Sequence, residues 1–392
     1  MYRFVRRFID TLRKGDLVLL LLCVVANAFG CLMVASTTNG YSEGSLRYLI
    51  VQIGASFAGI AAYVGMSAID TDFFSEHRRS LVVFNSILLF MLIPFGVTVN
   101  GNRSWLSFPF LPFNIQVAEI CKITFILILA SVMASHQNHM SNYKSIGHML
   151  LHLGLLFILS ILLSNDLGVS LIFLFVFVGM AFAGGVSLFW FLAAGSALAV
   201  TAPILWSMMP EYRKQRILVL IDPSLDPYGT GAMYHSIRAQ RSLTGGGLTG
   251  QGLFEGNRTQ TGALYAQHTD YIFAAIGEEL GFLGCAFVLL LLVLIVGRCV
   301  WVGIRSQDTM RRLVCFGAAA ALIFQVIINV GMCIGVMPVI GLTLPFISYG
   351  GSSLITLYAM LGLVSGVYAR PTATSQERYI RPPLSTRAKS PY

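Results

Sequence analysis

Charged side chains are scarce in this sequence. Asp, Glu, Lys and Arg make up 11% of the 392 residues, whereas 56% of the residues are hydrophobic. A soluble globular domain carries roughly 25% charged residues, so this composition excludes an ordinary soluble protein. The mean hydropathy of +0.75 points to an integral membrane protein. Membrane lipids are therefore expected partners, and nucleic acid is not.

Cysteine patterns and nucleotide-binding loops are missing as well. The seven cysteines fall in or beside apolar runs, and their spacing predicts neither disulfides nor a metal site. A glycine-rich run at residues 242–252 has no Lys after its glycines, which excludes a phosphate-binding Walker loop. The sequence identifies no cofactor and leaves a divalent cation open. It contains no internal repeat.

Long apolar segments are what the sequence has in quantity. A helix needs about 20 apolar residues to cross the hydrocarbon of a membrane. We predict an all-α integral membrane protein with about ten transmembrane helices and one large extracytoplasmic loop, at about residues 209–271, between spans 7 and 8. The predicted spans are 17–37, 46–68, 79–99, 117–135, 147–163, 167–184, 186–208, 272–298, 312–336 and 349–369.

The first span has a rival interpretation as a signal peptide. Ala26-Asn27-Ala28 resembles a cleavage site, but the apolar run continues past it. This continuation favours a retained helix, because a signal peptide has a short apolar region that ends at the cleavage site.

The distribution of Lys and Arg predicts the orientation. With the N-terminus inside, the inner segments hold 17 basic residues, whereas the short outer loops hold only Arg47 and Arg103. Basic residues favour the cytoplasmic side, so both termini are predicted to be cytoplasmic. Residues 1–16 form a basic N-terminus and residues 17–369 the transmembrane domain. Residues 370–392 form a basic tail that we expect to be disordered and to lie against anionic lipid.

One polar stretch lies where the long loop meets the eighth span. Asp270 stands at this junction, and Glu278 and Glu279 follow about two turns deeper. Charges this close to hydrocarbon are costly and, where present, usually functional. Glu278 and Glu279 cannot both be charged and unpaired inside a span. For these two residues a structural pairing and a substrate-binding role are both open.

Two blocks of sequence are specific enough to compare with a known family. The first reads His268-Thr269-Asp270-Tyr271-Ile272-Phe273, followed by Gly277-Glu278-Glu279-Leu280-Gly281. The second reads Leu344-Pro345-Phe346-Ile347-Ser348-Tyr349-Gly350-Gly351-Ser352-Ser353. These blocks resemble the SEDS family (shape, elongation, division, sporulation), the RodA/FtsW/SpoVE-type polymerases of bacterial cell-wall glycan. The likeness extends from about residue 101 to the end of the last apolar segment.

The resemblance implies a peptidoglycan glycosyltransferase of the bacterial plasma membrane, acting in cell elongation, division or sporulation. Its substrate would be lipid II, a disaccharide-pentapeptide on undecaprenyl pyrophosphate. A sugar hydroxyl of one unit attacks the anomeric carbon of another, and the lipid pyrophosphate leaves. The resemblance also implies a class B penicillin-binding protein, a transpeptidase, as partner.

Such a reaction needs a base near the attacking hydroxyl, and Asp270 is the candidate. The reference pKa of Asp is about 3.9, so Asp270 is a weak base unless partial burial raises its pKa. The alternative is an N-cap of the eighth helix, a position that Asp favours. His268 and Thr269 are candidates for binding substrate beside it. The family commonly has Leu-Pro-Glu before this motif, whereas this sequence has Tyr265-Ala266-Gln267.

The departing pyrophosphate needs cations, and two are candidates. Lys122 is three residues from Glu119 on one helix face, so the two form either an ion pair that locks helices together or a substrate site. The family has a similar Glu and Lys in this region, with a Pro and a Ser that are replaced here. Arg103, with Trp105, binds phosphate through its planar guanidinium or anchors the loop at the membrane interface.

Three further polar residues complete the predicted site. Asp166 opens the sixth span, either as a helix cap or as part of a motif similar to the family's Pro-Asp-Leu-Gly, in which Asn165 replaces the Pro. Ser348 and Ser352 lie in the second block, where Pro and Gly break the backbone. Their hydroxyl groups form hydrogen bonds either with backbone groups where the regular structure is interrupted or with a sugar of the substrate. Broken backbone at membrane depth is tolerated where it is buried in protein or lines a cavity.

Two other functions remain open at this stage. Glu119, Lys122 and Glu278 would line the translocation path of a lipid II flippase. The lack of a repeated half, which many transporters have, counts against that interpretation. The third alternative is an inactive scaffold of a wall-synthesis complex, which the altered residues before His268 leave open.

Overall fold

The computed structural model describes residues 11–40, 45–99, 102–109, 111, 113–226, 231, 233–264 and 266–370. Within these residues nine helices are long and apolar enough to cross a membrane, and a tenth apolar helix, α9, has 17 residues. The predicted helical membrane fold is therefore confirmed. The predicted basic tail lies outside the described residues apart from Arg370, as do the first ten residues.

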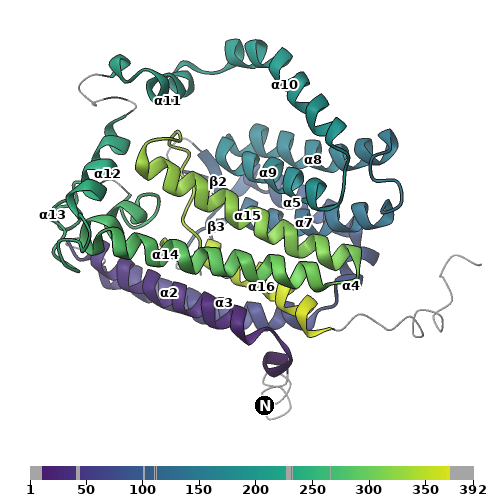
Figure 1. Cartoon of the computed structure of the whole chain (residues 1–392), viewed down its shortest axis with the longest axis horizontal. Helices are drawn as coiled ribbons and strands as arrows, with labels where there is room; N and C mark the ends of the chain where they lie inside the picture. Colours follow the sequence, from purple (N-terminus) through teal and green to yellow (C-terminus); the bar gives the residue numbers. More distant parts are fainter. Residues whose placement is uncertain are drawn as a thin grey trace, which may run out of the picture.

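The helices follow the predicted spans with shifts of a few residues at their ends (Figure 1). The nine described membrane-length helices are α2 (Leu17–Thr38), α3 (Ser45–Ala68), α5 (Arg78–Phe90) with α6 (Leu92–Phe95), α7 (Val117–Ser135), α8 (Tyr143–Ser164), α10 (Leu188–Met208), α14 (Ile272–Arg305), α15 (Thr309–Ile334) and α16 (Gly351–Ala369). The shorter apolar helix is α9 (Leu167–Ala183). The other short helices are α4 (Thr71–Glu76), α11 (Glu211–Ile221), η1 (Pro223–Leu225), α12 (Tyr234–Gly245) and α13 (Asn257–Gln260). The long loop is thus partly helical.

The third span is shorter than predicted, because its last residues form a strand. The chain leaves α6 at Gly96, and β1 (Gly96–Val99) pairs antiparallel with β2 (Asn102–Leu106). β2 in turn pairs with β3 (Ile115–Gln116), which leads directly into α7. Pro94 and Gly96 weaken a helix at this point, and the β-branched residues 97–99 favour a strand. The prediction of helix at 96–99 was wrong, and the fold contains a small sheet in addition to its helices.

Close packing of α3 against α16 forms one side of the bundle (Figure 1). A Cβ added at Gly362 would meet the backbone of Tyr63, and one added at Gly59 would meet the ring of Tyr358. Small residues let helix backbones approach closely, and van der Waals packing of this kind drives helix association in lipid.

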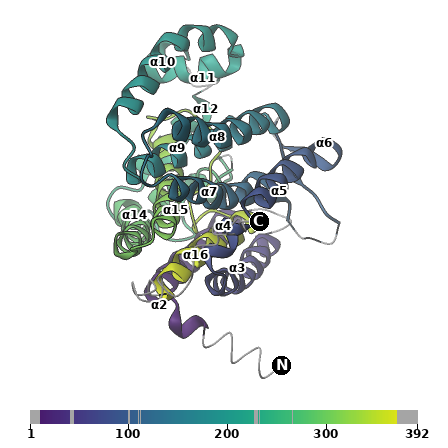
Figure 2. The ribbon, with the colours of Figure 1, turned by 90° about the vertical axis from the view of Figure 1, so that its right-hand side faces the viewer.

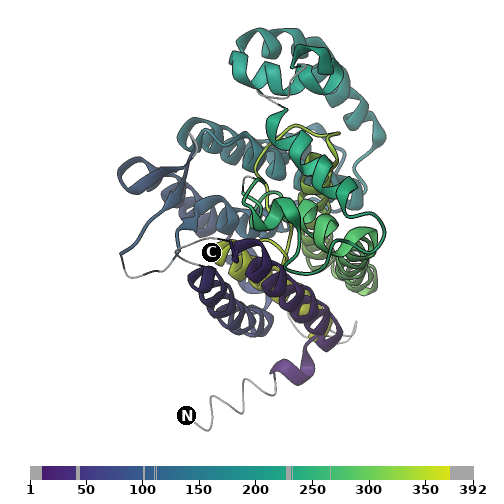
Figure 3. The ribbon, with the colours of Figure 1, turned by 90° about the vertical axis from the view of Figure 1, so that its left-hand side faces the viewer.

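Helix α10 stands apart from the bundle. None of its described residues is buried, and it carries Pro203 in its interior. Figures 2 and 3 show α10 and α11 arching away from the packed helices. Its exposed side chains are almost all apolar, as expected for a helix surrounded by hydrocarbon.

Helix α14 is broken at Gly281, which has φ +65° and ψ −162°. The glycine-rich loop at residues 246–252 lies in the break and supplies the missing hydrogen bonds. Gln251 N donates to Glu278 O at 2.9 Å, and Phe282 N donates to Gly247 O at 2.9 Å. Glu278 and Glu279 therefore precede the break and contact the loop. Both residues lie within α14, as predicted for the eighth span, but the break at Gly281 that follows them was not predicted.

We expect Gly246→Ala to destabilise the protein while Gly245→Ala is tolerated. A Cβ at Gly246 would clash with the carbonyl oxygen of Gly277, whereas one at Gly245 meets only side-chain atoms at 3.4 Å. Overpacking of a closed contact costs about 1–3 kcal/mol. Thermal unfolding of both variants in detergent measures the difference. Equal melting temperatures would show that the loop does not depend on this close approach.

A candidate active site at one end of the bundle

The predicted site residues gather where α7, α9, α14 and α16 begin. A loop at residues 337–350, between α15 and α16, packs against the turn at residues 266–270 that precedes α14. Tyr349 N donates to His268 O at 2.8 Å, and Ser348 Oγ donates to Thr269 O at 2.6 Å. The two sequence blocks are thus neighbours in space. Phe346 in this loop has φ +64°, a strained conformation of the kind that clusters at functional sites.

The backbone of Asp270 is held in place by a hydrogen bond from α15. Asn329 of α15 donates from Nδ2 to Asp270 O at 2.8 Å and to Leu342 O at 2.7 Å. The N-cap position of α14 belongs to Tyr271, and its side chain makes no capping hydrogen bond. The structure therefore does not place Asp270 as the N-cap and leaves its carboxyl group for another role.

The pKa of Asp270 is raised to about 6. Burial is the main cause, a hydrogen bond with the Thr269 side chain opposes it, and the negative charge of Asp166 raises it further. Asp166 and Asp270 face the same stretch of the 337–350 loop. A Cβ at Gly168 would meet Ile340 and lie 3.5 Å from Asp166 Oδ1, and a Cβ at Gly341 would lie 3.5 Å from Asp270 Oδ2. A carboxylate with a pKa near the operating pH suits a general base.

His268 lies in an aromatic cluster. Its ring centroid is 5.0 Å from that of Tyr48 and 5.7 Å from that of Tyr349. Burial lowers the pKa of His268 to about 4. The imidazole is therefore neutral at pH 7 and adds no positive charge beside Asp270.

Asp166 caps α9, as one of the two interpretations predicted. Its Oδ1 accepts from Val169 N at 3.2 Å, and its Oδ2 accepts from Ser104 Oγ at 3.0 Å. Asn165, with φ 55°, is in turn held by Arg213, whose Nη2 donates to its side chain at 2.9 Å. The carboxyl of Asp166 is thus fixed from three elements, namely β2, α9 and, through Asn165, α11.

Lys122 and Glu119 form a buried ion pair on α7, with 2.7 Å between Nζ and Oε2. Thr356 of α16 donates to the same Glu119 oxygen at 3.1 Å. One turn before the pair, Ser352 Oγ accepts from Gln116 N at 3.3 Å. The pair therefore lies at the α7–α16 contact, close below the second block.

Glu278 and Glu279 are fully buried, and their described hydrogen bonds are internal. Glu278 accepts from the backbone N of Arg258 and Thr259 at 2.9 and 3.0 Å. Glu279 accepts from Ser36 Oγ at 2.6 Å and from Gln260 Nε2 at 2.8 Å. These contacts tie α13 and α2 to α14. Both residues therefore favour the structural interpretation.

Arg103 and Trp105 lie on strand β2. The guanidinium of Arg103 donates to Ile93 O at 2.7 Å and to Gly96 O at 3.1 Å. Trp105 is half-buried and pairs with Gln116 and Val97 in the sheet. The contacts of Arg103 favour an anchor of the hairpin over a phosphate ligand. Ser348 likewise donates to backbone, so its hydroxyl repairs the broken chain.

Sequence reasoning missed Asn329, Ser104 and Gln52. Gln52 of α3 bonds the loop at two points, donating to Ser348 O and accepting from Gly350 N, each at 3.2 Å. An amide inside an apolar span is a recognisable signal, because a buried polar group must find partners. Among the described residues no group of three or more His, Cys, Asp and Glu side chains could hold a metal ion.

Comparison with known proteins identifies the family of this chain. The family model described as "Cell cycle protein", FtsW/RodA/SpoVE, matches residues 16–372. The chain belongs to the FtsW/RodA/SpoVE family. Peptidoglycan glycosyltransferase MrdB of Escherichia coli K12 is 33% identical over 358 residues, which cover 90% of this chain and 93% of that protein. Probable peptidoglycan glycosyltransferase FtsW of Geobacter metallireducens is 32% identical over 379 residues, covering 93% and 97%.

Solved structures share the FtsW/RodA/SpoVE fold. One chain, from a structure entitled "Structural coordination of polymerization and crosslinking by a peptidoglycan synthase complex", has a TM-score of 0.76 and 28% identity, covering 93% of this chain and 98% of that one. The rod shape determining protein RodA of Thermus thermophilus has a TM-score of 0.64 and 26% identity, covering 90% and 96%. The fold of this chain is therefore the fold of that family.

Proposed function

We propose that this chain is a peptidoglycan glycosyltransferase that polymerises lipid II, with Asp270 as the general base. The proposal rests on the Asp270 carboxyl group, which does not cap α14. Its backbone is fixed by Asn329, and burial raises its pKa to about 6. The base accepts the proton of the attacking sugar hydroxyl while undecaprenyl pyrophosphate leaves. The names of the relatives support this assignment.

The leaving pyrophosphate is assigned to the region where α7 and α16 begin. Lys122 is the cation there, and the N-termini of the two helices carry partial positive charge that favours anions. Asp166 positions the α9 end of the site. Glu278 and Glu279 hold the outer loop in place and need not touch substrate.

A structural neighbour supports a partner protein, and the distribution of basic residues supports an orientation in the membrane. The structural neighbour from a peptidoglycan synthase complex supports a class B penicillin-binding protein as the partner transpeptidase. The basic residues at the end of the bundle away from Asp270 support cytoplasmic termini and an outward-facing site. In this proposal the reaction takes place at the outer leaflet of the bacterial plasma membrane.

Incubation of the purified protein with lipid II in detergent tests the proposal, with and without the partner transpeptidase. We expect glycan polymer that lengthens with time. A flippase needs two compartments and makes no polymer in a micelle. Lipid II recovered unchanged, with the partner present and the protein folded, would exclude the enzyme and leave the flippase or the scaffold.

The rate of polymerisation is expected to fall as the pH drops through about 6. The base must be deprotonated, and protonation of Asp270 with a pKa of about 6 removes it. Because the charge of Asp166 helps to raise that pKa, Asp166→Asn should move the acid limb to lower pH. Initial rates between pH 5 and 8 measure both effects. If Asp166→Asn does not shift the fall in rate to lower pH, the charge of Asp166 does not influence the pKa of Asp270.

A further inference from the structure

A polar cavity of about 570 Å³ lies at the opposite end of the bundle from Asp270. It is formed by α4 with the start of α5, by the last turns of α7 and by the start of α15. The proposed site lies instead where α7 begins and α15 ends. We call this cavity the α5 pocket. It shares no residue with the proposed active site.

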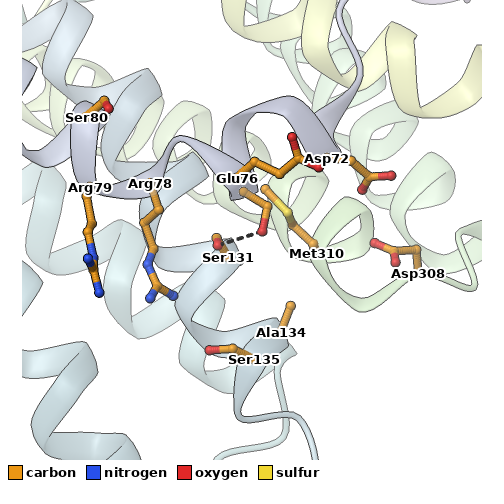
Figure 4. Close-up of a pocket in the computed structure, with 11 residues that line it drawn as sticks. Asp72, Glu76, Arg78, Arg79, Ser80, Ser131, Ala134, Ser135, Asp308 and Met310 are labelled. Carbon is orange, nitrogen blue, oxygen red and sulfur yellow. Dashed lines mark hydrogen bonds between the residues drawn. The ribbon is translucent and has the colours of Figure 1, made fainter. Parts of the chain in front are cut away.

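Figure 4 shows how charge is divided in the α5 pocket. Arg78 and Arg79 lie on one flank, and Asp72, Glu76 and Asp308 lie on the other. Ser131 lies between them, hydrogen-bonded at 3.0 Å to Ser75. The pocket therefore offers a positive and a negative surface a short distance apart, separated by hydroxyl groups.

Two of the three acids already have partners. Asp72 pairs with Arg311 at 3.7 Å, and Asp308 accepts from the Arg311 backbone N at 2.9 Å as the cap of α15. Over the described part of the chain, Arg78, Arg79 and Glu76 make no ion pair. The charges left for a ligand are thus two guanidinium groups and one carboxylate. An Arg pair suits a phosphate, and a carboxylate suits an ammonium group.

An apolar surface begins directly below these charges. Val83, Phe84 and Ile87, one to two turns along α5 from Arg79, are exposed, as expected for side chains that contact lipid. A ligand that fits both regions carries a zwitterionic head and an apolar tail.

We propose that the α5 pocket binds the head group of a phospholipid, with Arg78 and Arg79 on its phosphodiester and Glu76 on the ammonium group of ethanolamine. The acyl chains lie along the exposed apolar face of α5. The lipid thereby joins α4 and α5 to the start of α15, which share the pocket wall. Binding of this kind is independent of the proposed enzymatic function.

Native mass spectrometry of the protein released from nanodiscs tests this. The discs contain equal parts of phosphatidylethanolamine, phosphatidylcholine and phosphatidylglycerol. We expect phosphatidylethanolamine to be retained in preference to the other two, because choline cannot donate a hydrogen bond to Glu76 and glycerol carries no positive charge. The Arg78→Gln/Arg79→Gln variant should retain at least about tenfold less phosphatidylethanolamine, as expected for lost hydrogen bonds to a charged group. Glu76→Gln should narrow the preference over phosphatidylcholine.

Lys144→Gln is the matched control, because it removes an exposed basic residue at the same end of the bundle. It should retain lipid like the wild type. Added phosphatidylethanolamine should also raise the melting temperature of the wild type but not that of the double Arg variant. Equal retention of the three lipids, a preference for phosphatidylglycerol, or full retention by the double variant would overturn the proposal. So would equal stabilisation by glycerophosphoethanolamine, which has no acyl chain.

Discussion

The Asp270→Asn variant is expected to polymerise lipid II about 10²–10⁴-fold more slowly than the wild type, because its amide cannot accept a proton at neutral pH. Asn is nearly isosteric with Asp, and the hydrogen bond from Asn329 reaches the backbone oxygen, which the substitution keeps. Asp222→Asn, in the long loop before α14, is the control. The Asp222 carboxyl group is exposed, and within the described part of the chain it accepts hydrogen bonds from Ser224, so activity should be unchanged. Retention of more than roughly a third of wild-type activity by Asp270→Asn would remove Asp270 from the base role.

Folding of the Asp270→Asn variant should be normal, and the sign of the pKa shift explains why. The pKa of Asp270 is about 6 in the folded protein and about 3.9 in an unfolded chain, so the fold disfavours the charged form. Its contribution to stability is therefore fully present below pH 3.9 and is lost as the pH rises through 6. At pH 8 the neutral Asn should be at least as stable as the wild type. A lower melting temperature at pH 8 would mean that the carboxylate holds the fold.

The transmembrane architecture could be predicted because hydrocarbon demands long apolar helices, and that demand is visible in composition alone. The hairpin at residues 96–106 could not, because residues 79–99 are apolar whether they form helix or strand. The break in α14 was also hidden. Gly281 breaks the helix only because the loop at residues 246–252, some thirty residues earlier, supplies hydrogen bonds to the open turns. Hydrogen bonds between segments that lie far apart in the chain leave no local pattern in the sequence.

The candidate site was visible where charge meets apolar sequence, as at Asp270, Asp166 and Lys122. The roles of these residues depended on partners that lie far away in the chain. Ser104 bonds Asp166, and Asn329 bonds the backbone of Asp270. Neither partner is charged, so neither stood out in the sequence. Glu278 and Glu279 illustrate the reverse case, since their charge was conspicuous while their contacts are structural.

Replacement of Lys122 by Met is expected to lower both stability and polymerisation. The Lys122 ammonium is buried beside Glu119, and loss of one partner of a buried ion pair costs about 3–5 kcal/mol because the other charge stays uncompensated. The single variant therefore cannot tell a structural role from a role in binding pyrophosphate. Lys144→Met, which removes an exposed lysine at the far end of the bundle, should leave both properties unchanged.

The Glu119→Gln/Lys122→Met double variant separates the two roles. It removes both charges of the pair, and the amide oxygen of the introduced glutamine can still accept the hydrogen bond from Thr356. Thermal unfolding should therefore show most of the lost stability recovered. If Lys122 stabilises the departing pyrophosphate, polymerisation by the recovered protein should remain about 10–100-fold below wild type, the effect of losing a hydrogen bond to a charged group. Activity that returns together with stability would show that Lys122 serves only to hold α7 against α16, and the cation for the leaving group would have to be sought elsewhere.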